Sequence, residues 1–473
     1  MREAGTKDLT NFEKRLVGLE FENQIIGDNL RPITFERMQK VWKDFEKLGW
    51  KINTDPVLRV IGSLDKNFGN GNVNLSSDSA AGNLERAFPP VQNLGEAEKL
   101  LSKVHADALK VLGKNKLRML GTGLQPGIFS SPKKMRTKNT IYLALEKMGA
   151  SDYFDNAMMM ANSAHQAGIS LRIEEVIDVT NELTKVTGLI VSLFANSCIQ
   201  SWKLLPWQEW RMICWDLRFI GAEPGFYKLT GFPPKPFKSL TDYFKYYWDL
   251  PHMILPPTRE EVWCVPVKKI NYFGYFSGKE FEARSLLGKR TKLEPSVKDI
   301  NLAMISMWPH AKPHLVIDSE QATVSDFMEN LRKNTLEKYL KGKLLNCYME
   351  YRGAAASPPN EEMALPAFVL GLVENISEVK KFTKQYSWNE WKELVYKASV
   401  YGMDIKINGK SIYGLLKKLL EIAEEGLNGR KMNEAKYLKV PWKRLANKEN
   451  PASQSALAFK KSKKDFLKLI TYK

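Results

Sequence analysis

The stretch Glu350-Tyr351-Arg352-Gly353-Ala354-Ala355 decides the fold, because it sets an acid and a base two residues apart. Residues two apart in an extended strand point to one face, so Glu350 and Arg352 would project together. An earlier stretch, Gly18-Leu19-Glu20-Phe21-Glu22, gives two acids the same spacing. Apolar residues accompany the polar ones in both stretches, which is typical of strands with one face in a core. The sequence therefore predicts two strands whose polar faces line a cleft.

Two further acids, Asp78 and Glu85, would complete a set of five carboxylates. Carboxylates that converge in one cavity repel each other, and their pKa values rise unless cations lie between them. Mg²⁺ prefers oxygen ligands, and an arginine among the acids suits phosphate. The set therefore indicates a site for Mg-ATP and phosphoryl transfer, in which catalysis is mostly positioning and charge neutralisation. The alternative is a solvated strand face, on which Glu350 and Arg352 would form only a surface pair.

Several blocks of sequence follow one another in a recognisable order. The strongest block joins residues 348–354 to residues 363–372, and the others are residues 120–126, 193–197, 242–251 and 422–427 with Arg430 and Glu434. In the residues of these blocks and in their order, the chain resembles the glutamate-cysteine ligases, in particular the branch found in plants and many proteobacteria. That branch lies within the carboxylate-amine ligase superfamily, whose fold is glutamine synthetase-like.

The resemblance implies an α+β fold, in which a curved, mostly antiparallel sheet forms a funnel-shaped active site surrounded by helices. It also implies roles for ten residues. Arg352 and Glu350 would take part in catalysis, Arg352 and Gln166 would contact the nucleotide, and Arg136, Arg211 and Arg218 would bind substrate; the metal ligands would be Glu20, Glu22, Asp78, Glu85 and Glu350. Asp78 is the additional member of the metal set, since Ser76 occupies an alternative aligned position.

The chain departs from the family pattern mainly in the substrate half of the site. Relatives carry Asn or His where this chain has Gly168, a second arginine near Ile141, and proline where it has Cys198. Arg211 and Arg218 resemble the remnant of a longer Arg/Trp/Asp-rich stretch. The nucleotide and metal half therefore matches the family better than the substrate half does.

The resemblance implies an ATP-dependent ligase that forms a γ-glutamyl amide through an acyl phosphate. Its substrates would be glutamate, ATP and an amine such as cysteine. The product with cysteine, γ-glutamylcysteine, belongs to glutathione biosynthesis. The alternatives are a γ-glutamyl ligase for a different amine, and a non-catalytic nucleotide-binding relative with a basic partner-binding surface. The sequence does not define the oligomeric state.

The net charge of +18 is the main argument for another class of function. Residues 430–473 contain thirteen Lys and Arg against three acidic residues, a net charge of +10. A lysine-rich surface also serves solubility, and the usual base-stacking motifs are absent. We therefore expect any binding to nucleic acid to be nonspecific.

Composition predicts a cytoplasmic enzyme without membrane attachment. The N-terminus lacks the apolar segment of a signal peptide, and no run of about eighteen apolar residues occurs. The four cysteines are widely spaced, which favours reduced core residues over zinc ligands or disulfides. We expect residues 1–473 to form a single catalytic unit with an insertion at about 314–343 and a basic C-terminal segment at 430–473. Helical periodicity is clear in residues 35–48, 94–112, 174–196, 324–340, 388–401 and 412–427, and a short helix is predicted at 243–248 between two Pro-rich loops.

Overall fold

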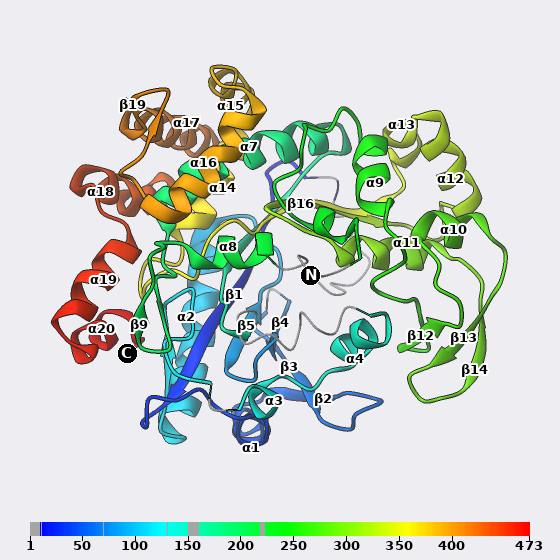
Figure 1. Cartoon of the computed structure of the whole chain (residues 1–473), viewed down its shortest axis with the longest axis horizontal. Coiled ribbons are helices and arrows are strands. Elements are labelled where there is room, and N and C mark those ends of the chain that lie inside the picture. Colours follow the sequence, from blue (N-terminus) through cyan, green and yellow to red (C-terminus); the bar gives the residue numbers. More distant parts are fainter. Residues whose placement is uncertain (1–9, 11, 70, 130, 150–159, 218–222) are drawn as a thin grey trace.

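A nine-stranded sheet lies at the centre of the computed structural model, which describes residues 10, 12–69, 71–129, 131–149, 160–217 and 223–473 (Figure 1). Across the sheet the strands are β16 (Ala311–Ile317), β17 (Leu344–Tyr351), β7 (His165–Ser170), β1 (Val17–Gly27), β5 (Asn83–Ala87), β4 (Asn72–Ser77), β3 (Ile61–Asn67) and β2 (Lys51–Thr54), and β6 (Leu117–Leu120) also pairs with β1. Every neighbouring pair is antiparallel. The predicted α+β class with a mostly antiparallel sheet is therefore confirmed.

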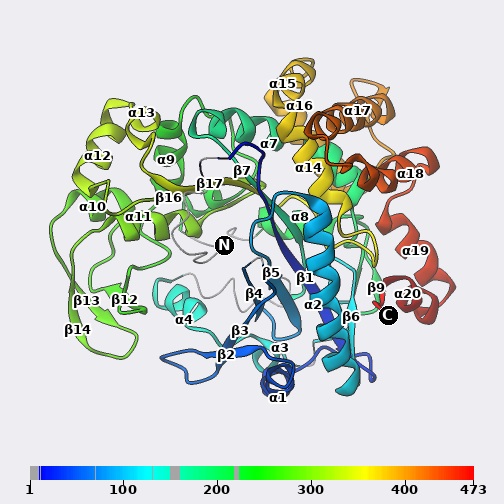
Figure 2. The same ribbon diagram turned by 180° about the vertical axis from the view of Figure 1, so that it is seen from behind.

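Strand β1 divides its side chains between two environments. Leu19 and Phe21 are buried in the main hydrophobic core. On that side α2 (Leu94–Lys114) and α14 (Ala364–Glu374) pack against the sheet, and Figure 2 shows α2 in front of β1 when the molecule is seen from behind. Glu20 and Glu22 alternate with the apolar residues and so lie on the opposite face. The local alternation of the sequence thus decides which face carries the acids.

Most of the predicted helices form close to their predicted bounds: α1 (Phe35–Glu46), α2, α7 (Val176–Phe194), α9 (Leu240–Trp248), α16 (Trp388–Tyr401) and α17 (Tyr413–Arg430). Helix α9 begins three residues earlier than predicted, since the Ser239 side chain accepts a hydrogen bond from the backbone N–H of Asp242 and caps it. The prediction of a single helix at 324–340 is wrong. It is two helices, α12 (Val324–Lys333) and α13 (Leu336–Leu340), because Asn334 has a left-handed backbone (φ 60°) that ends α12.

Helices α14 and α17 approach each other closely at two glycines. A Cβ at Gly371 would lie 2.2 Å from the carbonyl oxygen of Ala423, and one at Gly426 would lie 2.1 Å from the carbonyl oxygen of Gly371. Any larger residue would force the two helices apart. This packing supports the back of the sheet, because α14 also contacts β1 and β7.

The remaining elements surround this frame. The shorter helices are α3 (Pro132–Met135), α4 (Thr140–Lys147), α8 (Trp210–Leu217), α10 (Tyr272–Ser277), α11 (Val297–Ala303), α15 (Ile376–Thr383), α18 (Lys439–Asn447), α19 (Pro451–Lys461) and α20 (Lys463–Ile470). One small sheet contains β11 (Thr258–Arg259), β12 (Val262–Pro266), β13 (Phe281–Ser285) and β14 (Arg290–Leu293), and three pairs join β8 (Ile199–Gln200) to β9 (Lys203–Leu204), β10 (Thr230–Gly231) to β15 (Trp308–Pro309), and β18 (Lys406–Ile407) to β19 (Lys410–Ser411).

The division of the chain into one catalytic unit, an insertion and a basic segment stays a prediction. Residues 314–317 belong to β16 of the central sheet, and after α20 residue Thr471 bridges to Leu120 of β6. All four cysteines are buried and unpaired, as predicted. Within the part of the chain that the structure describes, no helix combines the length and apolar character needed to cross a membrane.

Candidate active site

Three carboxylates meet on the sheet face opposite the main core. Glu20 and Glu22 come from β1 and Glu85 from β5, and one carboxylate oxygen of each lies within 4.8 Å of the other two. Glu22 is directly opposite Glu85 in the antiparallel register, so their side chains share one face. We call these three residues the acid triad. Carboxylate oxygens at this spacing are the ligands that a hard cation such as Mg²⁺ prefers.

Hydrogen-bond donors on neighbouring strands orient the acid triad. The side-chain amide of Gln166 on β7 donates to Oε1 of Glu20 (2.7 Å) and to Oε1 of Glu22 (3.2 Å). The backbone N–H of Ala164 donates to Oε2 of Glu22 (2.8 Å), and the hydroxyl of Ser76 on β4 donates to Oε1 of Glu85 (3.0 Å). Each carboxylate keeps further lone pairs for a cation.

Burial makes the charges of the acid triad unfavourable without a cation. Burial and the charge of Glu350 raise the pKa of Glu20, and burial and the charge of Asp78 raise the pKa of Glu22 to about 8. Burial and the charge of Glu20 raise the pKa of Glu85 well above its ordinary value. These carboxyls would bind either protons or metal ions, and the donor set therefore fits Mg²⁺.

The other two predicted metal ligands have different surroundings. Glu350 on β17 hydrogen-bonds through one oxygen to Arg352 and through the other to His314. Although burial opposes its ionisation, the guanidinium of Arg352 and the imidazole of His314 hold the pKa of Glu350 well below its ordinary value. Asp78, in the turn before β5, accepts a hydrogen bond from the hydroxyl of Tyr142 (2.8 Å). The structure thus brings three of the five predicted acids within ligand distance and places Glu350 among basic groups beside them.

Gln166 connects Arg352 to the acid triad. Nη1 of Arg352 donates to Oε1 of Gln166 (2.6 Å), while the Gln166 amide nitrogen donates to the two acids of β1. This arrangement fixes the orientation of the Gln166 amide and places a planar guanidinium at the edge of the acid triad. The neighbouring His165 lies on the core face, where it stacks on Phe21 (ring centroids 4.3 Å apart). It therefore does not supply the polar side chain that relatives carry at the position of Gly168.

The predicted substrate-binding arginines have different environments. Arg136 forms an ion pair with Glu146, and its guanidinium lies 5.8 Å from the ring centre of Tyr142, whose hydroxyl donates to Asp78. Arg211, on α8, is buried and donates from Nη1 to the carbonyl oxygen of Arg352 (2.9 Å). Arg218 lies outside the described residues.

Strand β16 adds basic groups that our sequence analysis missed. Lys312 is directly opposite Glu350 in the register, and His314 stacks on Tyr348 with the two rings 2° from parallel. Burial lowers the pKa of Lys312 to about 8, against the effect of Glu350. The signal that could have found them is the alternation of His310, Lys312 and His314 at strand spacing.

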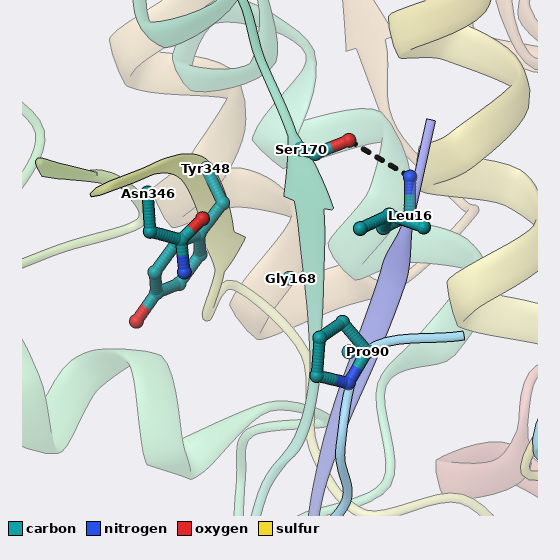
Figure 3. A pocket seen from close by; sticks show the side chains of 7 residues that line it. Leu16, Pro90, Gly168, Ser170, Asn346 and Tyr348 are labelled. Atoms are coloured by element: carbon teal, nitrogen blue, oxygen red, sulfur yellow. Dashed lines mark hydrogen bonds between the residues drawn. The ribbon is translucent and has the colours of Figure 1, made fainter. Parts of the chain in front are cut away.

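A small cavity continues this sheet face beyond Glu350, and Figure 3 shows it from close by. Its lining residues are Leu16, Gly18, Pro90, Gly168, Ser170, Asn346 and Tyr348. Gly18 and Gly168 lie opposite each other in the register, and the Ser170 hydroxyl accepts a hydrogen bond from the backbone N–H of Leu16 (2.8 Å; Figure 3). The cavity measures about 10 Å³, which is room for about one water molecule and not for a substrate.

A comparison with protein families finds glutamate-cysteine ligase family 2 over residues 16–251. The chain belongs to this ligase family. It is therefore an ATP-dependent enzyme of the carboxylate-amine ligase type. The matched residues include the acid triad, Asp78 and Gln166, whereas Glu350 and Arg352 lie beyond them.

A comparison with solved structures finds three ligases, and the first of them shares the fold of this chain. Glutamate-cysteine ligase of Francisella tularensis, in complex with AMP, matches with a TM-score of 0.56 and 13% identity, covering 98% of this chain and 88% of that one. A bifunctional glutathione synthetase from Pasteurella multocida matches with a TM-score of 0.48 and 10% identity, covering 96% and 51%. The ligase PafA, in complex with the ubiquitin-like protein Pup, matches with a TM-score of 0.40 and 10% identity, covering 96% and 69%. No curated protein sequence matches the chain.

Proposed function

We propose that this ligase joins the γ-carboxylate of glutamate to the amine of cysteine and consumes ATP. The observation that carries the proposal is the acid triad, held together by Gln166 and linked through it to Arg352. This arrangement sets oxygen ligands for cations beside a guanidinium suited to phosphate, which is what phosphoryl transfer requires. Membership of the glutamate-cysteine ligase family supports the choice of substrates.

Each group in the site would have one role. Mg²⁺ held by the acid triad, with Asp78 and Glu350 beside it, would neutralise negative charge on the triphosphate. Arg352 would donate to the γ-phosphoryl oxygens, because its bonds to Gln166 and Glu350 both come from Nη1 and use only part of its five-donor fork. Arg211 and Arg136 would bind the carboxylates of glutamate, together with Arg218.

The reaction would proceed in two steps. An oxygen of the glutamate γ-carboxylate attacks the γ-phosphorus of ATP, and ADP leaves, which gives γ-glutamyl phosphate. The amine nitrogen then attacks the acyl carbon, the bond from that carbon to the phosphate oxygen breaks, and the nitrogen loses a proton as the amide forms. Neither step needs a nucleophile from the protein.

The acyl phosphate requires protection from water, and the burial of the site supports this requirement. Glu22 is 7% exposed, Glu350 8% and Arg211 3%. Polar groups with so little solvent contact act in a low-dielectric environment, where fixed hydrogen bonds stabilise developing charge more strongly than water does.

The four unpaired cysteines support a further part of the proposal. Buried thiols without disulfides are usual in reducing compartments, so we place the enzyme in the cytoplasm, with ATP, glutamate and an amine as its small-molecule partners.

The proposal is tested by incubating the purified protein with ATP, Mg²⁺, glutamate and a panel of amines, with products identified by mass spectrometry. We expect γ-glutamylcysteine, ADP and phosphate in equal amounts. The Glu20→Gln variant, which loses one acid of the triad, should turn over at least about 10²-fold more slowly. Glu282→Gln, on the exposed face of β13, is the matched control and should leave turnover unchanged.

Two outcomes would contradict the proposed substrates. A γ-glutamyl product with another amine but not with cysteine would identify a ligase of different specificity, in line with Gly168 at a position where relatives carry a polar side chain. The absence of glutamate-dependent ADP release with every amine would identify a non-catalytic nucleotide-binding relative.

A further inference from the structure

Strand β16 places a buried lysine next to the arginine that we assign to phosphate. Lys312 is 3% exposed and directly opposite Glu350 in the register. Glu350, on β17, is two residues before Arg352. An ammonium group has three donors. Among the described residues, its one hydrogen bond runs from Nζ to the carbonyl oxygen of Ile305, at 3.3 Å. Donor capacity of Lys312 is therefore left for a ligand.

Among the described residues near β16 and β17, the basic side chains outnumber the carboxylates that hydrogen-bond to them. Glu350 is the carboxylate closest in the register to Lys312, and its two oxygens already bond to Arg352 and His314. Within the described residues, no hydrogen bond from the side chain of Lys312 or Arg211 reaches a carboxylate. Carboxylates of the site lie near both cations, but burial still lowers the pKa of each, so an anion bound from outside the chain would stabilise their charges.

A buried histidine at the same edge points to the same conclusion. His310 is 5% exposed, and neither ring nitrogen has a hydrogen-bond partner among the described residues. Its carbonyl oxygen accepts from the backbone N–H of Arg352 (2.7 Å), so the two residues are neighbours across β16 and β17. Buried polar atoms without partners are rare in folded proteins and are typical of sites that bind a ligand or water.

We propose that Lys312 donates hydrogen bonds to the terminal phosphoryl group of ATP, and to the same group once it is joined to the amino-acid carboxylate. The inference rests on the proposed function, because it requires ATP on the face of the acid triad. A phosphoryl group fits better than a carboxylate, since Lys312 is a strand neighbour of Glu350 and so lies beside Arg352, and the three phosphoryl oxygens can accept from both cations.

The test compares nucleotide affinities by calorimetry, with Mg²⁺ and without amino acids. For Lys312→Met, the affinity for a non-hydrolysable ATP analogue should fall at least about 10-fold, because a charge-assisted hydrogen bond is lost. The affinity for ADP, which lacks the terminal phosphoryl group, should change less than about 3-fold. Lys312→Arg keeps the charge and should bind the analogue within about 3-fold of the wild type. Lys338→Met on α13 removes an exposed lysine as a control and should change neither affinity.

Three results would overturn the inference. Unchanged affinity for the analogue with a raised KM for glutamate would assign Lys312 to the amino-acid carboxylate. An equal loss of affinity for both nucleotides, together with a lower melting temperature, would assign it a purely structural role. Unchanged affinities and kinetics would leave it no role in the site. Lys312→Gln, which keeps a donor, replaces Lys312→Met where the latter does not fold.

The experiment separates this inference from the proposed function. If the wild type binds the analogue but forms no γ-glutamyl product, the proposed substrates are wrong. The ratio of analogue to ADP affinity in Lys312→Met still decides the role of Lys312.

Discussion

Replacing Glu22 by Gln should weaken the stabilisation of the protein by Mg²⁺. The substitution keeps the shape of the side chain, and the new amide oxygen can still accept from the backbone N–H of Ala164, which now lies 2.8 Å from the carboxylate. It removes one of three negative charges that lie within 4.8 Å of one another. The metal-free variant should therefore be more stable than the metal-free wild type, and the variant should gain less from Mg²⁺.

The pKa of Glu22 sets how much folding stability the metal-free wild type loses as the pH rises. Burial and the charge of Asp78 raise this pKa from 4.5 to about 8, so the folded protein holds a proton that the unfolded chain releases. The stability that this proton gives is fully present below pH 4.5 and is lost as the pH rises towards 8. At pH 8 the loss is on the order of 4 kcal/mol, at 1.36 kcal/mol per pH unit. Glu22→Gln does not have this loss.

The stabilisation of the folded protein by Mg²⁺ follows from mass action. Mg²⁺ at about 100 times its Kd stabilises the wild type by about 2.7 kcal/mol, and a 100-fold weaker site would gain about 0.4 kcal/mol. With an unfolding entropy of about 2.1 cal/mol/K per residue, the 473 residues give a Tm shift of about 1 °C per kcal/mol. Mg²⁺ should therefore raise the Tm by about 3 °C in the wild type and by less than about 1 °C in the variant.

The assay is thermal unfolding at pH 8, first in a chelator and then with increasing Mg²⁺. The wild type, Glu22→Gln and the control Glu282→Gln on β13 are compared. The control should follow the wild type, since Glu282 is exposed. An equal Mg²⁺-dependent rise in Tm for wild type and Glu22→Gln would refute the assignment of the acid triad to the metal.

Four other outcomes are expected. Arg352→Lys should bind Mg-ATP within several-fold but lose about 10²- to 10³-fold in turnover in steady-state assays, because an ammonium cannot replace the planar guanidinium; a change in Tm alone would mean that Arg352 only joins strands. Burial raises the pKa of Glu209 from 4.5 to about 7, so its contribution to stability should be lost, by about 3 kcal/mol, as pH rises between these values. Denaturant unfolding of Glu209→Gln at several pH values should lack this loss, and an unchanged pH profile would contradict the shift. Gly371→Ala should lower stability by about 1–3 kcal/mol or more in denaturant unfolding, because its methyl group would meet the carbonyl oxygen of Ala423; wild-type stability would disprove the close approach. Binding of nucleic acid through residues 430–473 should be indifferent to sequence and weaken steeply with salt in titrations, and sequence-selective binding at physiological salt would refute this.

The sequence determined those features that depend on neighbouring residues alone. The alternation of Leu19 and Phe21 with Glu20 and Glu22 is a strand period, and it assigned the acids to one face before any partner strand was known. The same reasoning located most helices. It failed at Asn334, where a single left-handed residue divides a continuous periodic pattern into α12 and α13.

Only the tertiary structure decided which side chains meet across the sheet. Glu22 is opposite Glu85, and Lys312 is opposite Glu350, although each pair is far apart in the chain. The bond between Glu350 and Arg352 follows from their spacing in the chain, whereas the bond between Glu350 and His314 of β16 was invisible in the sequence. The physical reason is register. A slip of one residue between two strands would turn every side chain of one strand to the other face, and nothing within a single strand specifies the alignment with its neighbour.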